Sequence, residues 1–260
     1  RIERASNLRL LLTAGVGSDH FDLAAAAERN VTVAEITGSN VVSVAEHVVM
    51  QMLTLVRNYI PSYQEVIAGG WDIGKVAARS HDLQDKTVGI IGYGNTGQAF
   101  ARKLRGFDVQ TLCYDIVGGV GNGDARQVGM PELMQHADVV SLHVPETPET
   151  IGMVDAGFLG GFAKPIWLLN TARGKCVRTG DLVDALRTGR VLGAGLDVLE
   201  YEKSSFESLF GEDGMPPDMQ ELIRSPRVLL SPHVAGWTVE SKEKLAATIV
   251  RKIKEHYQGK

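Results

Sequence analysis

The sequence predicts a doubly wound α/β fold with a parallel central sheet, and two observations lead to that prediction. Apolar runs of strand length alternate with segments of helical periodicity along most of the chain. One of these runs, at 88–91, opens into the glycine pattern G-x-G-x-x-G at 92–97, which a helical segment follows. Because the carboxyl ends of parallel strands share one edge of such a sheet, we expect the functional residues to follow the strands.

The individual elements can be assigned from periodicity and from turn residues. Strands are expected at 8–13, 31–34, 88–91, 109–114, 137–142, 166–170, 193–197 and 228–230. Helices are expected at 21–29, 44–66, 98–104, 131–136, 156–162 and 179–188. The long helix at 44–66 tolerates a kink near Pro61, and the polar, glycine-rich stretch 69–85 is predicted to be a loop. The basic residues at 251–254 are interpreted as the end of a solvated helix.

Composition and charge exclude several classes of protein. The 260 residues have a formal net charge of −4 and contain no basic block, which argues against binding to nucleic acid or to an anionic membrane. No apolar run approaches the roughly 20 residues that a membrane span needs. The two cysteines, Cys113 and Cys176, lack the spacing of a disulfide framework or of a metal site. We therefore expect reduced thiols in a cytoplasmic protein without a metal.

The glycine pattern indicates a dinucleotide site. Gly92 permits a tight turn, Gly94 lets the backbone approach a pyrophosphate, and Gly97 allows helix and strand to pack closely. The pyrophosphate is then expected at the helix N-terminus, next to Asn95 and Thr96, where free N–H groups and the macrodipole favour negative charge. The glycine pattern alone is a weak signal.

A carboxylate at the end of the next strand strengthens this interpretation. The apolar run 109–114 ends at Asp115, which follows Gly97 by 18 residues. A carboxylate at this position can accept both ribose hydroxyls of an adenosine and repels a 2′-phosphate. The sequence therefore predicts NAD rather than NADP as the cofactor.

Three polar residues that follow later strands are the candidates for chemistry. Arg173 follows the run 166–170, Glu202 follows 193–197, and His233 follows 228–230. Each of them taken alone could be an ordinary surface residue. Their joint position on the carboxyl edge of the sheet, downstream of a dinucleotide motif, favours an active site.

The motifs around these residues resemble those of the D-2-hydroxyacid dehydrogenases. The resemblance covers essentially the whole chain and rests on six segments. They are Asn40-x-x-x-Val44-Ala45-Glu46, Gly92–Gly97, His143-Val144-Pro145-x-Thr147, Asn170-Thr171-Ala172-Arg173-Gly174, Asp197-Val198-x-x-x-Glu202 and Ser231-Pro232-His233.

The resemblance implies a role for each candidate residue. Arg173 would bind the substrate carboxylate through its bidentate guanidinium, His233 would be the general acid/base, and Glu202 would be its carboxylate partner. The remaining implied ligands fall into two groups. The substrate pocket would include Val16, Gly17 and Asn40; the cofactor site would include, besides the glycine turn and Asp115, the residues His143, Pro145, Thr147, Thr171, Ala172 and Asp197.

The chemistry of alcohol oxidation independently supports the histidine and its partner. Oxidation of a secondary alcohol removes a hydride and an O–H proton, so a base must stand beside the carbinol. Histidine has a suitable intrinsic pKa, and a carboxylate such as Glu202 would fix its tautomer and stabilise the imidazolium.

The resemblance also implies the domain organisation. Residues 43–237 are expected to form a Rossmann-type NAD-binding domain. Residues 1–42 and 238–260 are expected to form a smaller flavodoxin-like substrate domain that is truncated at its N-terminus, since the family's chains start several tens of residues earlier. Relatives place the helix that follows residue 43 in a two-fold interface, so we predict a homodimer.

The first eighty residues resemble NAD-dependent formate dehydrogenases of the same superfamily more than other members. The segments 12–20, 46–50, 57–61 and 69–71 contain that likeness. Formate becomes CO₂ by loss of a hydride alone, and formate dehydrogenases have Gln where this chain has Glu202. The Glu202–His233 pair therefore favours a 2-hydroxy acid as substrate, and formate oxidation is the alternative.

Two non-enzymatic alternatives also remain open. The corepressors of the C-terminal-binding-protein type resemble this family and use NADH as a binding signal. The chain could equally be an inactive fragment that still binds NAD. The sequence does not identify the 2-hydroxy acid, because residues that select a substrate side chain lie on loops.

Overall fold

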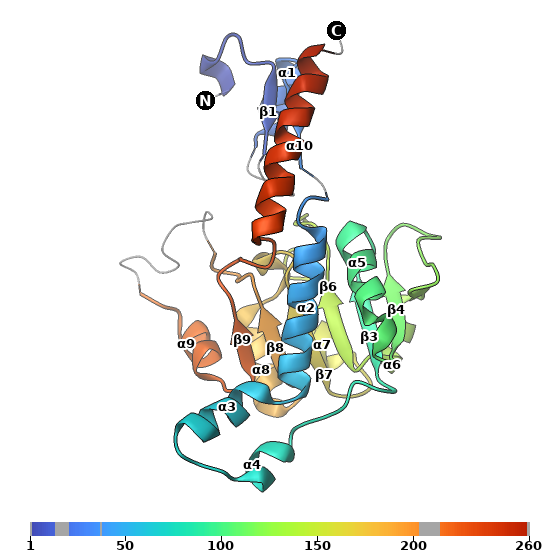
Figure 1. The fold of residues 1–260 in the computed structure, drawn as a ribbon, viewed down its shortest axis with the longest axis vertical. Helices are drawn as coiled ribbons and strands as arrows, with labels where there is room; N and C mark the ends of the chain where they lie inside the picture. The colour runs from blue at the N-terminus through green and yellow to red at the C-terminus, as the bar shows by residue number, and fades with distance from the viewer. Residues whose placement is uncertain (1, 14–20, 37, 203–213, 259–260) are drawn as a thin grey trace. The chain divides into compact units, whose positions relative to one another are not determined.

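The computed structural model describes residues 2–13, 21–36, 38–202 and 214–258 (Figure 1). The chain divides into two compact units. The smaller unit comprises Arg1–Ser43 and Gly236–Lys260, and the larger unit comprises Val44–Ala235. The predicted role of the smaller unit in substrate binding stays a prediction. No helix in the described ranges has the length and apolar character needed to cross a lipid bilayer.

In its described residues the smaller unit contains a two-stranded parallel sheet and two α-helices. Its elements are β1 (Leu10–Leu12), α1 (Leu23–Glu28), β2 (Thr32–Ala34) and α10 (Val239–Gln258), after a 3₁₀ turn at Ile2–Arg4. Asp22 caps α1, because its Oδ1 accepts a hydrogen bond of 2.9 Å from the Ala25 N–H. Thr238 and Ser241 cap α10 reciprocally: each hydroxyl accepts the other's backbone N–H, at 3.0 Å and 2.8 Å.

The larger unit is built on the predicted parallel sheet. Within the described residues the strand order is β5-β4-β3-β6-β7-β8-β9, and every neighbouring pair is parallel. The strands are β3 (Thr87–Ile91), β4 (Gln110–Tyr114), β5 (Arg126–Gln127), β6 (Val139–Leu142), β7 (Ile166–Asn170), β8 (Val191–Leu196) and β9 (Val228–Leu230). The order reverses direction between β3 and β6, as a doubly wound fold requires.

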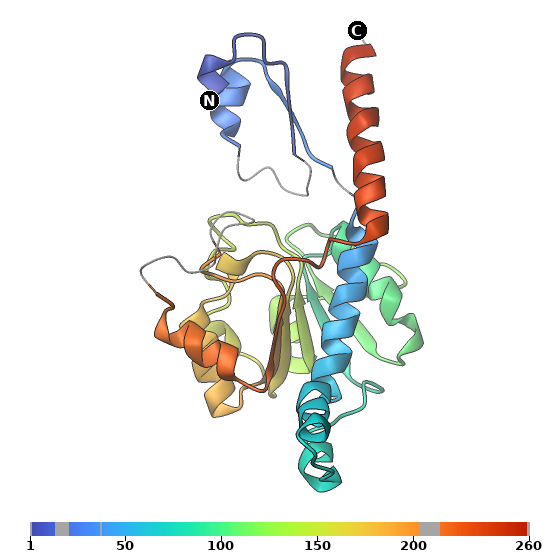
Figure 2. The same ribbon diagram turned by 60° about the vertical axis from the view of Figure 1, so that its left-hand side comes forward.

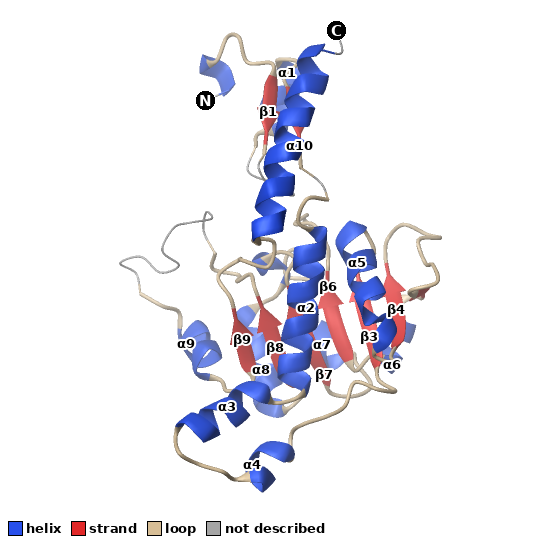
Figure 3. Ribbon diagram, viewed as in Figure 1, coloured by secondary structure: helices blue, strands red, loops and turns tan. Residues whose placement is uncertain are grey.

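Helices cover both faces of this sheet. On one face lie α2 (Val41–Val56) and α5 (Asn95–Lys103) (Figures 1 and 3). The other face is covered by α6 (Met130–His136), α7 (Ala156–Gly160), α8 (Thr179–Thr188) and α9 (Pro217–Arg224), whose apolar residues share one buried cluster with the strands. Burial on both faces explains why β3, β6 and β7 are apolar almost throughout.

Two glycines let α2 approach the sheet closely. A Cβ atom on Gly195 of β8 would lie 3.0 Å from the Gln51 side chain of α2, and one on Gly193 would lie 3.2 Å from Leu55. A larger residue at either position would therefore push α2 outward. His47, one turn before Gln51 on the same helix, is thereby held near the carboxyl end of β8.

The structure corrects the prediction of one long helix at 44–66. The helix divides into α2 and α3 (Tyr59–Ile67), and the break is at Asn58, whose φ of +50° is left-handed. Asparagine tolerates this conformation better than most residues. Pro61 does not kink a continuous helix, because it lies in the first turn of α3, where its missing N–H costs no intrahelical bond.

Other departures concern short or terminal elements. The predicted loop 69–85 contains the short helix α4 (Ile73–Ala77), which Asp72 caps by accepting the Lys75 N–H at 3.0 Å. β5 and α9 are not predicted from the sequence, and the basic residues expected at a helix end belong to the long helix α10. In both views α3 and α4 extend beyond the amino ends of the strands (Figures 1 and 2).

Candidate active site

The glycine turn after β3 has the geometry that the sequence predicts. Gly92 has a φ of +89°, and a Cβ atom on it would lie 2.6 Å from the His143 carbonyl oxygen. A Cβ atom on Gly97 would collide with the Gly92 carbonyl oxygen. At Gly94, by contrast, a Cβ atom would meet nothing within 4 Å. The first and third glycines thus close the turn, and the second leaves open space beside the backbone.

The turn leads directly into α5 and leaves donors at its start. Gly94 is the N-cap and offers no side chain, so the N–H groups of the first turn, from Asn95 onward, have no capping side chain. Uncapped N–H groups at the positive end of a helix attract an anion. Together with the open space at Gly94, this arrangement fits the pyrophosphate of a dinucleotide.

Asp115 follows β4 and is fixed by the same turn. Its Oδ2 accepts the Tyr93 N–H at 2.6 Å, and its Oδ1 accepts the Val117 N–H at 2.9 Å. The Tyr93 hydroxyl donates in turn to Asn122 Oδ1 at 2.9 Å, which ties the following loop to the turn. A carboxylate oxygen has two lone pairs, so Asp115 keeps acceptor capacity for ribose hydroxyls.

The loop after β6 is held by buried contacts around His143. The backbone N–H of His143 donates to Ile91 O at 2.7 Å, and its Nε2 lies 2.9 Å from Ser141 Oγ. Burial lowers the pKa of His143 to about 4, so the ring is neutral near pH 7. The loop continues through the other two predicted residues: Thr150 Oγ1 donates to Pro145 O at 2.6 Å and accepts the Thr147 N–H at 2.8 Å.

The loop after β7 is organised by buried Asn170. Its Oδ1 accepts the Ala172 N–H and its Nδ2 donates to Arg173 O, both at 3.0 Å. The adjacent Thr171 Oγ1 is buried without a hydrogen-bond partner in the described part of the chain. A buried hydroxyl without a partner is costly. This orphaned hydroxyl fits the predicted place of Thr171 in the cofactor site.

Asp197, at the end of β8, anchors the loop that bears His233. Its Oδ1 accepts from Ser231 Oγ at 2.6 Å and from the Val234 N–H at 2.9 Å. Its Oδ2 accepts the Ala235 N–H at 2.8 Å, and its carbonyl oxygen accepts the His233 N–H at 2.8 Å. The Asp197 side chain is 1% exposed. The predicted place of Asp197 in the cofactor site stays a prediction, whereas its hold on this loop is a direct feature of the structure.

These anchors hold His233 in an unusual backbone conformation. Its φ is +54°, in the left-handed region that costs a residue with a Cβ atom roughly 1–3 kcal/mol. Such a conformation persists only where the surroundings determine it. The hydrogen bonds that Asp197 accepts from the backbone of residues 233–235 supply that determination.

His233 and Glu202 meet as the sequence predicts. His233 Nδ1 lies 2.5 Å from Glu202 Oε1, although the two residues are 31 positions apart. The hydrogen bond to Glu202 raises the pKa of His233 above its ordinary value, with burial and the charge of Arg173 acting in the opposite direction and the charge of Asp197 in the same one. Because Nδ1 faces Glu202, Nε2 is the nitrogen that remains for a proton transfer.

Arg173 lies close enough to this pair for its charge to act on His233. Its backbone is extended, and its Nη1 donates to Ala172 O at 2.9 Å. The structure thus brings Arg173, Glu202 and His233 together at the carboxyl edge of one sheet. Their roles in binding and proton transfer stay predictions.

The predicted substrate-pocket residues lie elsewhere in the chain. Asn40 belongs to the smaller unit, where its side chain fills the space next to Gly236. Val16 and Gly17 lie outside the described residues.

One feature of the site was not predicted. His47 of α2 has its Nε2 3.0 Å from Ser231 Oγ and 3.7 Å from Asp197 Oδ1. The sequence alone assigns no role to His47. No sequence signal could have joined it to Ser231, because 184 positions separate them and only the packing of α2 on the sheet unites them.

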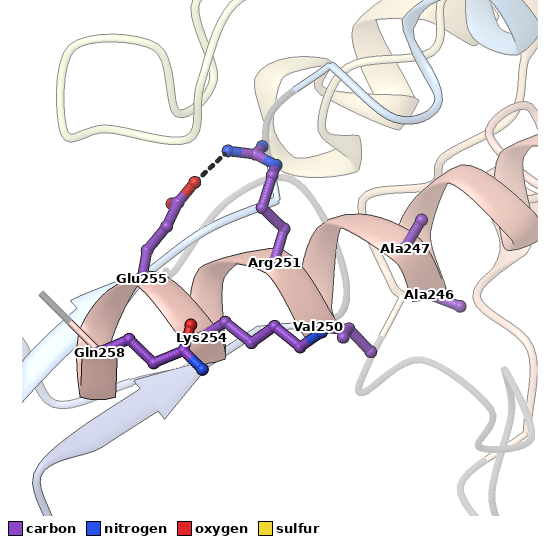
Figure 4. A pocket seen from close by; sticks show the side chains of 7 residues that line it. All are labelled: Ala246, Ala247, Val250, Arg251, Lys254, Glu255 and Gln258. Atoms are coloured by element: carbon purple, nitrogen blue, oxygen red, sulfur yellow. Dashed lines mark hydrogen bonds and ion pairs between the residues drawn. The ribbon is translucent and has the colours of Figure 1, made fainter.

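A hollow of about 890 Å³ elsewhere in the structure lies along α10 of the smaller unit (Figure 4). It is lined by Ala246, Ala247, Val250, Arg251, Lys254, Glu255 and Gln258. Arg251 and Glu255 form an ion pair of 2.8 Å across one helical turn. None of the predicted site residues lines this hollow, so it has no part in the chemistry considered above.

Comparison with known proteins identifies the family. Residues 49–235 match the model of the D-isomer specific 2-hydroxyacid dehydrogenase NAD-binding domain. The chain belongs to this family of dehydrogenases. Its larger unit is therefore an NAD-binding domain of the Rossmann type, in agreement with the glycine turn and Asp115.

Curated relatives of this family member include several formate dehydrogenases. The formate dehydrogenase of Chaetomium thermophilum is 35% identical over 274 residues, covering 100% of this chain and 70% of the relative. The chloroplastic/mitochondrial formate dehydrogenase of Arabidopsis thaliana is 34% identical, covering 100% of this chain and 66% of the relative. The dehydrogenase chain thus spans about two thirds of the length of these relatives.

Solved structures of the same family superpose well on the chain. The NAD-dependent formate dehydrogenase of Staphylococcus aureus, solved in complex with NAD, has a TM-score of 0.83 at 37% identity and covers 98% of this chain and 73% of its own. The D-lactate dehydrogenase of Aquifex aeolicus, solved with NAD and lactic acid, has a TM-score of 0.87 at 30% identity, with coverages of 97% and 77%. The resemblance to both branches that the sequence motifs indicated is confirmed.

Proposed function

We propose that this chain interconverts a D-2-hydroxy acid and its 2-keto acid with NAD as the hydride carrier. The observation that supports the proposal most is the contact of 2.5 Å between His233 Nδ1 and Glu202 Oε1. A histidine with a carboxylate partner can give and take a proton at a substrate oxygen. Oxidation of a hydroxy acid needs that proton transfer.

Three residues of the chain have different roles in the proposed reaction. Arg173 binds the substrate carboxylate through its guanidinium and so orients the neighbouring carbon. His233 takes the hydroxyl proton through Nε2 during oxidation and returns it to the keto oxygen during reduction. Glu202 fixes the tautomer of the imidazole and stabilises its charged form. NAD, when bound, supplies the site that accepts or gives the hydride.

Oxidation of formate is the second candidate function, and the comparisons favour it. The curated relatives and the solved structure with 37% identity are formate dehydrogenases. The chemistry favours the hydroxy acid, because formate loses a hydride and no proton, so a raised histidine pKa has no use in that reaction. Glu202, in a position where the resemblance implies Gln for formate dehydrogenases, agrees with the hydroxy-acid reaction.

A spectrophotometric assay at 340 nm distinguishes the candidates. With NADH and a panel of 2-keto acids, we expect turnover with at least one acid. With NAD and formate, we expect none. Turnover with formate alone would establish the alternative, and binding of NADH without any turnover would point to a binding protein or an inactive fragment. The variant Arg173→Lys is the control for the substrate site, because a point charge cannot replace the bidentate guanidinium.

We also propose that the protein is a homodimer. Large apolar side chains are exposed on α3, on α4 and on the turn between them: Tyr59, Tyr63, Val66, Ile67, Trp71 and Ile73 are each more than half exposed. Contiguous exposed apolar side chains are typical of protein interfaces. The cytoplasmic location and the absence of a nucleic-acid or membrane partner, which the sequence predicts, stay predictions.

A further inference from the structure

His47, Ser231 and Asp197 form a polar chain behind the catalytic pair. Ser231 Oγ lies 2.6 Å from Asp197 Oδ1 and 3.0 Å from His47 Nε2. The three residues come from different elements, since His47 lies on α2, Asp197 follows β8 and Ser231 follows β9. The Asp197 side chain is 1% exposed and that of His47 is 15% exposed.

The direction of these hydrogen bonds follows from the chemistry of the groups. The Asp197 carboxylate accepts hydrogens from Ser231, Val234 and Ala235, so it acts as an acceptor only. The single hydroxyl hydrogen of Ser231 is therefore used towards Asp197. Towards His47 the Ser231 oxygen can only accept, which assigns a hydrogen to His47 Nε2.

The hydrogen-bonded series from His47 through Ser231 to Asp197 ends at the backbone segment that orients His233. Asp197 accepts the N–H groups of three successive residues, those of His233, Val234 and Ala235. These bonds hold His233 at its left-handed φ of +54°. A rotation of the Asp197 carboxylate would release two of the three N–H groups, and His47 and Ser231 are the side chains that resist that rotation.

We propose that His47 is a positioning residue for His233, acting through Ser231 and Asp197. The inference rests on the proposed acid/base role of His233. Its consequence is that the hydrogen on His47 Nε2, rather than the bulk of the ring, keeps His233 aligned with Glu202.

Loss of the alignment with Glu202 should lower the pKa of His233. The charged and titratable groups that face His233 are Glu202, Asp197 and Arg173, and His47 lies behind Asp197. The hydrogen bond that His233 Nδ1 donates to the Glu202 carboxylate is the main cause that raises the His233 pKa. A misaligned imidazole loses that bond, so its pKa falls towards the ordinary value of histidine.

A matched set of variants tests the proposal. His47→Leu removes the donor and keeps apolar volume, whereas His47→Gln keeps an N–H near the position of Nε2. His136→Leu, at the exposed end of α6, is the control for replacing a histidine. Side-chain NMR of the imidazoles gives the His233 titration directly. The assay with NADH and a 2-keto acid gives kcat and KM.

In His47→Leu we expect a lowered His233 pKa and a loss of kcat of about 10- to 100-fold. In His47→Gln and His136→Leu we expect values near those of the parent protein. Unchanged titration and kcat in His47→Leu, or equal losses in the Leu and Gln variants, would overturn the proposal.

The NMR readout separates this proposal from the proposed function. If the parent protein reduces no 2-keto acid, the proposed reaction is wrong, yet the His233 titration still shows whether His47 acts on it. If His47→Leu does not fold, Ser231→Ala removes the hydroxyl that links His47 to Asp197, and it is compared with Ser231→Thr, which keeps a hydroxyl. A shift of the His233 titration in the Ala variant and not in the Thr variant supports the proposal; no difference between them contradicts it.

Discussion

At the scale of single residues, the contact between Glu202 and His233 controls the protonation of the site. Reduction of a keto acid needs a protonated imidazole, so its kcat/KM should fall as the pH rises through the raised pKa of His233. Oxidation needs the neutral ring and should rise through the same pKa. The rates of reduction and oxidation should therefore depend on the same His233 pKa, and they should change with pH in opposite directions.

Glu202→Gln tests this dependence. Gln keeps the size of the side chain and removes the charge, so the His233 pKa should fall and the descending limb for reduction should move to lower pH. We also expect a loss of roughly 10²-fold in kcat/KM near neutral pH, within the range usual for general acid–base catalysis. Measurement of kcat/KM from pH 5 to pH 10 decides the matter, and an unmoved limb would exclude Glu202 as the partner.

His233→Ala tests the base itself. It should lower kcat for keto-acid reduction by about 10²–10⁴-fold. The affinity for NADH, measured by fluorescence titration, should remain nearly unchanged, because His233 follows β9, which three strands of the sheet separate from β3, whose glycine turn is proposed to hold the pyrophosphate. Normal turnover in this variant would show that another group transfers the proton.

The sequence was sufficient to predict this pair and insufficient to predict what holds it. Arg173, Glu202 and His233 could be selected because each follows a strand of a parallel sheet, where the chemistry of such folds is located. The positioning of His233 by Asp197 depends on backbone hydrogen bonds and on a left-handed φ, which no residue type reports. His47 depends further on how closely α2 packs against Gly193 and Gly195 of β8.

At the scale of elements, the turn from β3 to α5 contains one glycine with a structural role, Gly97, and one with a proposed role in binding the cofactor, Gly94. Gly97 has no room for a side chain, whereas Gly94 has open space around it and a φ of −76° that any residue can adopt. Gly94→Ala should therefore fold normally. Its methyl group should occupy space that the pyrophosphate needs, so the Kd for NADH should rise about tenfold or more, or at least about 1.4 kcal/mol.

The matched control for that experiment is Gly106→Ala, which also meets open space but lies in the 3₁₀ turn Leu104–Gly106 that follows α5. Thermal melting should give nearly the same Tm for both variants, and only Gly94→Ala should bind NADH more weakly. If both variants bound NADH as the parent protein does, the pyrophosphate would lie elsewhere. Gly97→Ala should instead lower the Tm, because its Cβ atom would collide with the Gly92 backbone.

The element boundaries show where periodicity stops being informative. The helix 179–188 was predicted with the bounds that the structure gives, because apolar spacing and the glycine after it mark both ends. The predicted helix 44–66 failed, because its apolar spacing continues across a break that is set by one left-handed residue, Asn58. Apolar periodicity describes which face is buried and does not reveal where the backbone turns.

At the scale of the whole molecule, the exposed apolar residues of α3 and α4 predict association. Trp71 is 80% exposed in the single chain, which is unusual for tryptophan unless a partner covers it. Trp71→Lys should weaken the proposed homodimer by at least about tenfold, since a buried interface disfavours an unpaired charge. Ile223→Lys on α9 is the control, because Ile223 is a partly exposed apolar residue outside that patch.

Size-exclusion chromatography with light scattering, over a range of protein concentrations, measures this association. We expect the parent protein and Ile223→Lys to remain dimeric at concentrations where Trp71→Lys is monomeric. A parent protein that is monomeric at every concentration would contradict the homodimer, and it would leave the proposed chemistry of the larger unit unaffected.

The stability of the fold towards acid should depend on His143. Its pKa is lowered to about 4 in the folded protein from the ordinary 6.5 of histidine, because burial disfavours the charged ring. Between these two values the unfolded chain binds more protons than the folded one. The free energy of unfolding should therefore fall as the pH drops from 6.5 towards 4, and His143 should add nothing to the pH dependence above that window.

His143→Gln isolates this contribution, because Gln keeps a polar side chain beside Ser141 and does not titrate. The parent protein should lose up to about 3 kcal/mol more than the variant between pH 6.5 and pH 4. Urea unfolding at several pH values gives both curves, and other acid-sensitive groups cancel in their difference. The variant should be the less stable protein near neutral pH and approach the parent as the pH falls. Parallel curves would mean that His143 is protonated or solvated in the folded protein. They would contradict the interpretation of His143 as a buried, neutral ring.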